Sequence, residues 1–380
     1  MKNKVIVAVM ISALGLILFI LFAAEPAYKQ AVFEPMSVVD IAPIEKTLPQ
    51  DNSKLYPFVS NTFFGFFNEA GQIVFSKEKR EHFSVCDSMW TSYDYQEPSE
   101  QVEAAQAKIL SPSGDELCSI PANGFVHLRS GRIFVFLPSG NSLCEYDRSG
   151  TFLRAYSMPG IITAFSCTKD LLVLGSSDGL ITCLDKNGEE KFSFYPGGSA
   201  MEIIYGLTVS EDGKYIGCLC GLEQQRFMLV AINDYHKIVF HTFLKNSLRT
   251  KATMFFDKRS KYLFSETAQG IVILNCSNLH FTQTKVKGRL CSYVVETVSE
   301  NFALLTQEND KGHISIFDAE CRSVGETDFD CSAASMIQIK NNFYLIYNFE
   351  IDGTGNFELL IEEYNICNKY SICQIQKVEK

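Results

Sequence analysis

Positive charge is scarce in this 380-residue chain. It has 34 Lys and Arg residues against 44 Asp and Glu, which gives a formal net charge of −10. No basic stripe interrupts this acidic balance. Nucleic acids and anionic lipids attract proteins mainly through positive charge. The composition therefore argues against a nucleic-acid partner or a surface for anionic lipid.

The common catalytic motifs are also missing from the sequence. It has no serine nucleophile elbow, no phosphate-binding glycine loop, no Cys and His pair and no clustered pair of acids. The six histidines are scattered, and His236 and His241 are five residues apart, which places them on opposite faces of a strand. We therefore expect no catalytic residue, no bound cofactor and no metal site.

The 13 cysteines form no recognisable disulfide framework, and their odd number means that they cannot all pair. Cys367 and Cys373 flank the last predicted hairpin and could pair across it. Most of the others lie in apolar runs, where a thiol behaves as a small buried hydrophobe: Cys144, Cys167, Cys183, Cys218, Cys220, Cys276 and Cys291. This pattern indicates a weakly oxidising compartment or cysteines that are shielded from oxidation.

What the sequence does contain is a recurring turn. A polar residue, two turn formers and a Gly lie between apolar runs at residues 68–71, 111–114, 147–150 and 185–188. Glycine accepts positive φ because it has no Cβ, so these segments predict hairpins. A further tight turn, 176–179, falls in the clearest repeat, residues 161–196. The residues that we expect to shape the turns are Gly71, Gly114, Gly150, Asp178, Gly179, Asp185 and Gly188.

The spacing of the turns predicts the fold. Weaker versions follow at 233–234, 275–278, 318–320 and 365–369, and successive turns are 36 to 48 residues apart. An all-β repeat of this length is typical of a β-propeller with one four-stranded blade per repeat. We expect eight blades over residues 54–377, with seven as the alternative. A β-sandwich also has many short strands, but it has no reason to repeat this pattern.

Closure of such a ring requires contact between its ends. The strands near residues 56–77 should pack against the blade formed by residues 336–375, because two blade faces would otherwise stay open to water.

The N-terminus predicts a membrane anchor. Lys2 and Lys4 precede 20 residues without a charge, long enough for a helix to cross a bilayer. We expect residues 1–24 to be a transmembrane signal-anchor that leaves the propeller on the extracytoplasmic, periplasmic side. A signal peptide cleaved near residues 21–23 is the alternative. Residues 25–53 contain four prolines and should form a tether, with one strand around residues 37–41.

Three carboxylates supply an enzymatic alternative. Asp87, Glu202 and Glu296 fall at or near predicted inner strands and could face the central channel, where a propeller enzyme would place its catalytic groups. The corresponding activity would be a hydrolase or lyase that acts on an envelope polymer. Residues 352–356 are similar to the start of a calcium loop, but Phe357 occupies the position that requires Gly, so we expect a long turn there.

Residues 176–188, Ser-Ser-Asp-Gly-Leu-Ile-Thr-Cys-Leu-Asp-Lys-Asn-Gly, resemble repeats of WD40 and quinoprotein-like propellers. The Gly-His and Trp-Asp pairs of WD40 blades are absent. Quinone-dependent dehydrogenases of the second group have a Trp in most blades, whereas this chain has only Trp90, so no quinone cofactor is expected.

The predicted architecture is also similar to the eight-bladed, non-enzymatic propeller subunit of the outer-membrane barrel-assembly machinery, an exported propeller that binds partner proteins. This resemblance implies a membrane-anchored, non-enzymatic scaffold for an envelope protein or peptide.

Overall fold

The computed structural model describes residues 30–40, 54–60, 63–79, 82–95, 105–233, 235–295, 301–339, 342–351 and 356–369. These residues form strands and the turns between them, and no helix among them is long and apolar enough to cross a bilayer. The predicted anchor, residues 1–24, lies outside the described part of the chain. The strand expected near residues 37–41 falls at the end of the longer strand β1 (Gln30–Asp40). The turn expected at residues 365–369 is wrong, because these residues lie in the continuous strand β31 (Asn356–Lys369).

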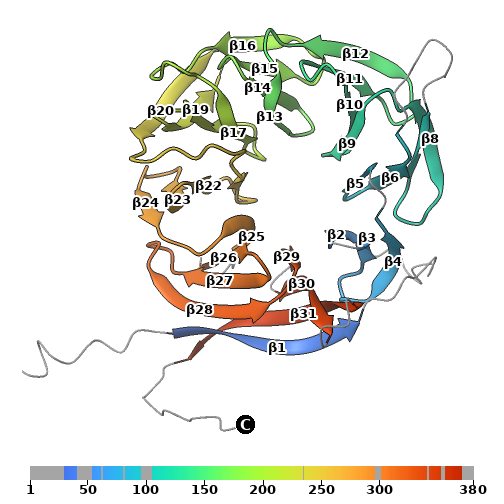
Figure 1. Cartoon of the computed structure of the whole chain (residues 1–380), viewed down its shortest axis with the longest axis vertical. Helices are drawn as coiled ribbons and strands as arrows, with labels where there is room; N and C mark the ends of the chain where they lie inside the picture. Colours follow the sequence, from blue (N-terminus) through green and yellow to red (C-terminus); the bar gives the residue numbers. More distant parts are fainter. Residues whose placement is uncertain are drawn as a thin grey trace, which may run out of the picture. The chain divides into compact units, whose positions relative to one another are not determined.

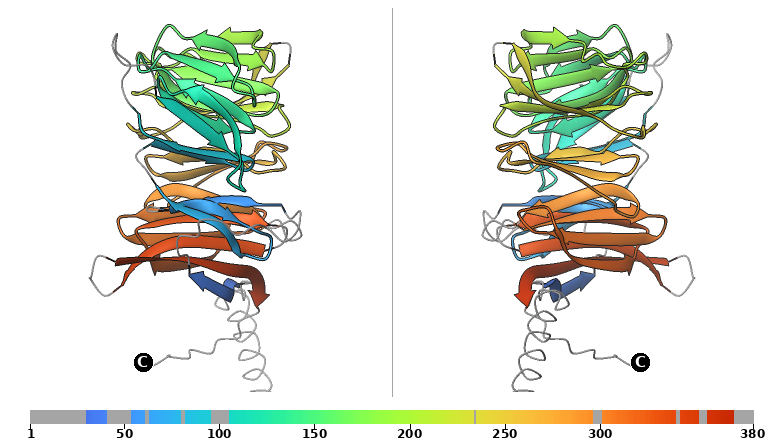
Figure 2. Two further views of the ribbon diagram at one scale, coloured as in Figure 1. Left: turned by 90° about the vertical axis from the view of Figure 1, so that its right-hand side faces the viewer. Right: turned by 90° about the vertical axis from the view of Figure 1, so that its left-hand side faces the viewer.

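The chain divides into two compact units, Met1–Glu34 with Ile366–Lys380, and Pro35–Asn365. Of the first unit the structure describes only the ends of β1 and β31 (Asn356–Lys369). The second unit holds a ring of twisted sheets, with the first strand of each sheet nearest the centre (Figure 1). Viewed from the side, the sheets fan out around the ring (Figure 2).

Most sheets consist of consecutive antiparallel strands. Along the chain these are β2 (Tyr56–Val59), β3 (Phe63–Phe67) and β4 (Ile73–Glu78); β5 (His82–Cys86), β6 (Met89–Tyr93), β7 (Gln106–Leu110) and β8 (Glu116–Pro121); β9 (Phe125–Arg129), β10 (Arg132–Phe136), β11 (Ser142–Tyr146) and β12 (Phe152–Ser157); and β13 (Ile162–Cys167), β14 (Leu171–Ser176), β15 (Ile181–Asp185) and β16 (Glu190–Phe194).

The second half of the ring continues in the same way. It comprises β17 (Ile204–Val209), β18 (Tyr215–Cys220), β19 (Arg226–Ile232) and β20 (His236–Phe243); β21 (Met254–Phe256), β22 (Tyr262–Thr267), β23 (Gly270–Asn275) and β24 (Phe281–Thr284); and β25 (Arg289–Val295), β26 (Phe302–Glu308), β27 (Lys311–Phe317) and β28 (Ser323–Asp330). The last sheet has the order β1-β31-β30-β29, with β29 at Ala333–Ile339 and β30 at Asn342–Ile351.

The prediction of an all-β propeller is confirmed, but the count of eight four-stranded blades is wrong. The described residues form seven four-stranded blades, the alternative number, and one three-stranded sheet, β2-β3-β4. The difference lies in the first sheet, where the turn at residues 68–71 resembles the turn at 147–150 in sequence but not in position. The latter joins the third and fourth strands of its blade, whereas the former joins a second strand to a third. The same local sequence therefore marks two different positions in a blade.

Burial on both faces holds the blades together. Middle strands such as β14 and β18 are buried along nearly their whole length, which is expected when one blade packs on two neighbours. Val173 and Cys218, from adjacent blades, are fully buried in one cluster. The expectation that most cysteines are buried is confirmed, because ten of the eleven cysteines whose side chains the structure describes are buried, and these eleven are free. The pair considered between Cys367 and Cys373 lies outside these described side chains. Burial raises the pKa of the Cys183 thiol to about 12.

The first sheet packs against the last blade, as expected. Phe67 of β3 lies with its ring centroid 5.5 Å from that of Tyr344 in β30. The Tyr344 hydroxyl donates a hydrogen bond of 3.0 Å to the carbonyl oxygen of Glu69, which is 275 residues away in the sequence. Phe58 and Ile346 are buried in the same cluster. The ring is therefore closed by apolar contact between its two ends.

Candidate functional site

The ring has two faces, which the strand register defines. Ile162 pairs with Ser176, and Ile181 pairs with Phe194, so the start of β13 and the end of β16 lie on one side. We call this side, where the first strand of each blade begins, the starting face. The other side, where the first strands end, is the ending face.

Several turns that join a third strand to a fourth are built by the same hydrogen bonds on the ending face. Asp185 Oδ1 accepts from the backbone nitrogens of Asn187 and Glu189, both at 2.8 Å. These bonds, the one from Glu189 above all, hold the pKa of Asp185 below its ordinary value. Asp147 forms the equivalent pair in the preceding blade. All of the turn glycines singled out from the sequence adopt positive φ, from 76° to 90°: Gly71, Gly114, Gly150, Gly179 and Gly188. The turns order the hairpins and bring no reactive groups together.

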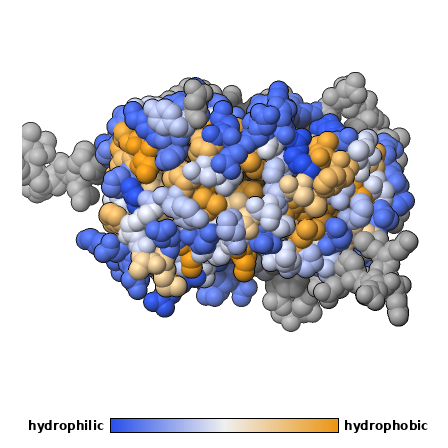
Figure 3. Space-filling view, turned by 90° about the horizontal axis from the view of Figure 1, so that it is seen from above, coloured by the Kyte–Doolittle hydropathy of each residue, from blue (hydrophilic) through white to orange (hydrophobic). Residues whose placement is uncertain are grey.

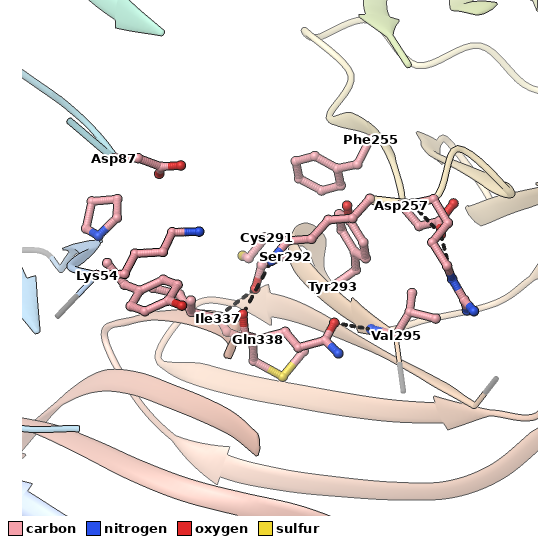
Figure 4. A pocket seen from close by; sticks show the side chains of 15 residues that line it. Lys54, Asp87, Phe255, Asp257, Cys291, Ser292, Tyr293, Val295, Ile337 and Gln338 are labelled. Carbon is pink, nitrogen blue, oxygen red and sulfur yellow. Dashed lines mark hydrogen bonds and ion pairs between the residues drawn. The ribbon is translucent and has the colours of Figure 1, made fainter. Parts of the chain in front are cut away.

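A cavity of about 680 Å³ opens in the centre of the ring. Its lining comes from five sheets, including the first strands β2, β21, β25 and β29 and the turn after β5. Lys54 and Asp87 lie on one side of it, and Phe255 and Tyr293 lie across from them (Figure 4). Of the acids proposed from the sequence, Asp87 is thus in the channel.

Hydrogen bonds between neighbouring blades fix the wall of this cavity. The backbone nitrogen of Met336 donates to Ser292 Oγ at 2.7 Å, and the Tyr293 hydroxyl donates to the carbonyl oxygen of Phe256. Burial raises the pKa of Tyr293, so this phenol stays protonated as a donor. Lys258 Nζ lies 3.4 Å from the carbonyl oxygen of Gln338. Desolvation, followed by the nearby charge of Lys54, lowers the pKa of Lys258.

A second cavity of about 770 Å³ shares Phe255 and Cys291 with the first. Arg129 and Lys251 line it together with Phe165. Beside them His127 packs its ring 5.1 Å from Phe136 and 6.2 Å from Phe165. Its pKa is lowered by desolvation, then by Lys251 and Arg129. Arginine and lysine therefore set the local potential of this part of the channel.

The remaining acid candidates do not join Asp87. Asp87 lies in the turn between β5 and β6, on the ending face, whereas Glu202 lies just before β17, on the starting face. Glu296 and residues 352–355 lie outside the described residues. In the described part of the chain no three His, Cys, Asp or Glu side chains are placed to hold a metal ion. Of these acids, Asp87 and Glu202 therefore do not come together in one site.

Apolar side chains on the starting face were not predicted from the sequence. Between 44% and 57% of their surface is exposed, although they are large: Phe125, Ile161, Tyr195, Met201 and Phe243. Each lies just before the first strand of its blade, at its start, or at or just after the end of the fourth strand. Each of these residues is a large apolar residue at or next to a strand end, and this pattern is visible in the sequence. Whether such a side chain is exposed depends on the register of the strands, which the sequence does not show. The rim over β12 and β16 is mostly hydrophilic, with separate hydrophobic patches (Figure 3). Phe152 and Leu153 of β12 are also large, apolar and exposed.

Comparison with known proteins agrees with this architecture. A family model described as "beta-propeller protein" matches residues 1–354. The chain belongs to this β-propeller family. A relative from Treponema pallidum (strain Nichols), called an uncharacterized protein, is 30% identical over 344 residues, which cover 88% of this chain and 89% of the relative.

Two solved structures share the fold. The propeller is similar to BamB from Moraxella catarrhalis, with a TM-score of 0.56 and 13% identity over 88% of this chain and all of that one. It is also similar to the computationally designed Ika8 protein, with a TM-score of 0.55 and 11% identity over 87% of this chain and 99% of the design. The expected resemblance to quinoprotein-like propellers is thereby confirmed at the level of fold.

Proposed function

We propose that this propeller is a non-enzymatic scaffold that binds an envelope protein or peptide on its starting face. The observation that carries the proposal is the set of large exposed side chains on that face, Phe125, Ile161, Tyr195, Met201 and Phe243. Aromatic residues and methionine are enriched where proteins bind one another, and exposed groups of such residues mark interaction sites.

The exposed side chains are held in place before any partner binds. The backbone nitrogen of Ile161 donates to Ser177 Oγ at 3.0 Å, and the Tyr195 hydroxyl lies 3.4 Å from Asp178 Oδ2. Arg226 stacks its guanidinium 5.8 Å from the ring centre of Phe243. Ordering a side chain at an interface costs free energy, so anchors that are already ordered favour binding.

Site-specific photo-crosslinking of the full-length protein in its native membranes tests this proposal. A photoreactive residue at Tyr195 or Phe243 should crosslink to one discrete partner protein. Tyr235 is the matched control, because it is 63% exposed but lies between β19 and β20, on the ending face. Equal crosslinking from Tyr235 and Tyr195, or no crosslink from the starting face, would contradict the proposal.

The proposed location rests on the N-terminal sequence, and we propose that residues 1–24 hold the propeller on the periplasmic side of the membrane. Protease added to intact spheroplasts should digest the propeller, whereas protection until the membrane is lysed would contradict this topology. A hydrolase or lyase has no specific support, because Asp87 and Glu202 lie on opposite faces.

A further inference from the structure

The central channel is rich in cations although the whole chain is acidic. Two carboxylates, Asp87 and Asp257, line the two cavities. Six basic side chains line them as well: Lys54, Arg129, Lys251, Lys258, Arg259 and Arg289. Since the chain carries a formal charge of −10, this local excess of positive charge runs against the overall composition.

Two of the six cations are matched by nearby carboxylates. Arg289 Nε lies 2.9 Å from Glu266 Oε1, and Arg259 Nε lies 3.9 Å from Asp257 Oδ2. Setting these pairs aside leaves four basic side chains against two carboxylates, Asp87 in the lining and Glu211 close enough to act on Lys258. The channel thus has a surplus of positive charge.

The four basic side chains form two separate groups. Lys54 and Lys258 line the first cavity. Desolvation and then the charge of Lys54 lower the pKa of Lys258, and the carboxylates of Asp87 and Glu211 oppose this effect. Arg129 and Lys251 line the second cavity and act together on His127. Charges of one sign held inside a protein repel one another, and a bound anion relieves that repulsion.

An apolar stretch separates the two groups. Phe255 borders both cavities, and its ring centroid lies 5.4 Å from that of Tyr293. The channel thus presents positive charge, an aromatic surface and positive charge in sequence. A compact inorganic anion would contact only one group, whereas an elongated ligand can contact both.

We propose that the channel binds an elongated organic anion with carboxylates at both ends of an apolar body. Lys54 and Lys258 hold one end, Arg129 and Lys251 hold the other, and Phe255 packs on the apolar part. An extended acidic peptide and a free dicarboxylate both supply this chemistry. The site is distinct from the starting face and does not depend on the protein-binding role proposed there.

Isothermal titration of the full-length protein in detergent at low ionic strength tests the site. The probes are the capped peptide Glu-Phe-Glu, its neutral counterpart Gln-Phe-Gln, and suberate, a free dicarboxylate. We expect the acidic peptide or suberate to bind and the neutral peptide not to bind. Tighter binding of the acidic peptide identifies a peptide ligand, and tighter binding of suberate identifies a free acid. Equal affinity for the two peptides, or no binding of either anion, would overturn the proposal.

Charge-removing variants locate the site. K258Q and K251Q should each weaken binding of the preferred anion about tenfold, as expected when one close charge contact is lost. K191Q is the matched control, because Lys191 is exposed on the outer strand β16, and its affinity should match the wild type. An equal loss in K191Q would mean non-specific attraction and would refute the channel site. Crosslinking from Tyr195 should be unchanged in K258Q, which separates this proposal from the preceding one.

Discussion

Replacing Glu145 by leucine should destabilise the propeller by about 3–5 kcal/mol, because removing one partner leaves a buried charge without its counter-ion. Glu145 lies on β11 and is only 3% exposed. Its Oε1 accepts a hydrogen bond of 2.8 Å from Arg132 Nε, and its Oε2 accepts one of 2.8 Å from the Tyr156 hydroxyl. Arg154 Nε lies 3.5 Å away. The buried carboxylate of Glu145 thus contacts two arginines and one tyrosine hydroxyl.

The loss of stability in the E145L variant should involve more than one blade. Arg132 also donates to the carbonyl oxygen of Leu171, in the next blade, at 3.0 Å. Its side chain is only 10% exposed, so water cannot replace the lost carboxylate easily. The E145Q variant keeps the shape and one acceptor but loses the charge. It should therefore cost less, about 1–3 kcal/mol, the range for a disrupted buried hydrogen bond.

Urea unfolding followed by circular dichroism measures these differences. E116Q is the matched control, because Glu116 pairs with Lys108 at 2.8 Å on the surface, where both side chains are about half exposed. Exposed pairs contribute about 0–1 kcal/mol, so E116Q should be close to the wild type. Combining E145L with R132M should recover part of the loss, since neither buried charge then remains alone. A loss in E145L no larger than in E116Q would refute this reasoning.

Three further outcomes follow from single sites. G150A should lower the free energy of unfolding more than G114A in the same urea assay. Both glycines have positive φ, but a Cβ at Gly150 would lie 2.8 Å from a backbone oxygen, whereas at Gly114 it meets nothing within 4 Å. The pKa of Asp328 is lowered because His313 donates a hydrogen bond to its carboxylate. The contribution of Asp328 to the free energy of unfolding is therefore present above the ordinary Asp pKa and is lost as the pH falls through the lower pKa of the folded state. D328N should flatten that acid limb of the stability curve, and an unchanged limb would be inconsistent with this linkage. Iodoacetamide at pH 8 should label Cys183 only after unfolding, as peptide mass spectrometry would show, because burial raises its pKa to about 12.

The propeller could be predicted from short sequence motifs because each of its repeated turns is formed by residues that are close together in the chain. The hydrogen bonds of Asp147 and Asp185 involve residues two and four positions ahead, so a short motif reveals them. The blade count failed because it depends on which strands a turn joins. The turn at residues 68–71 has the same local form but joins a second strand to a third. The pairing of β1 within the last sheet joins segments from opposite ends of the sequence, which no local pattern reports.

The channel was predictable only in part. Asp87 was expected there and lines the first cavity, whereas Glu202 lies on the other face of the ring. Lys54, Lys251 and Lys258 were not singled out, because each is an ordinary lysine in the sequence. The register and closure of the ring bring them to one channel. Such sites depend on tertiary structure rather than on a motif.

Closure predicts the behaviour of a shortened chain. Ending it after Asp330 removes β29, β30 and β31, including Tyr344 and Ile346 of the shared cluster, and exposes Phe58, Phe67 and Ile73 to water. Burying one large apolar side chain contributes about 1.5–3 kcal/mol, so losing the burial of this cluster is comparable with the whole stability of a typical domain, about 5–15 kcal/mol.

The truncated chain should therefore aggregate or show no cooperative melting transition in calorimetry. The Y344F variant is the control, because it keeps the apolar ring and removes the hydroxyl that donates to Glu69. It should melt cooperatively, with a loss of about 1 kcal/mol. A soluble truncated chain that melts cooperatively would show that β29, β30 and β31 are an appendage. The ring would then owe its stability to contacts between consecutive blades alone, and packing of β3 against β30 would contribute little to it.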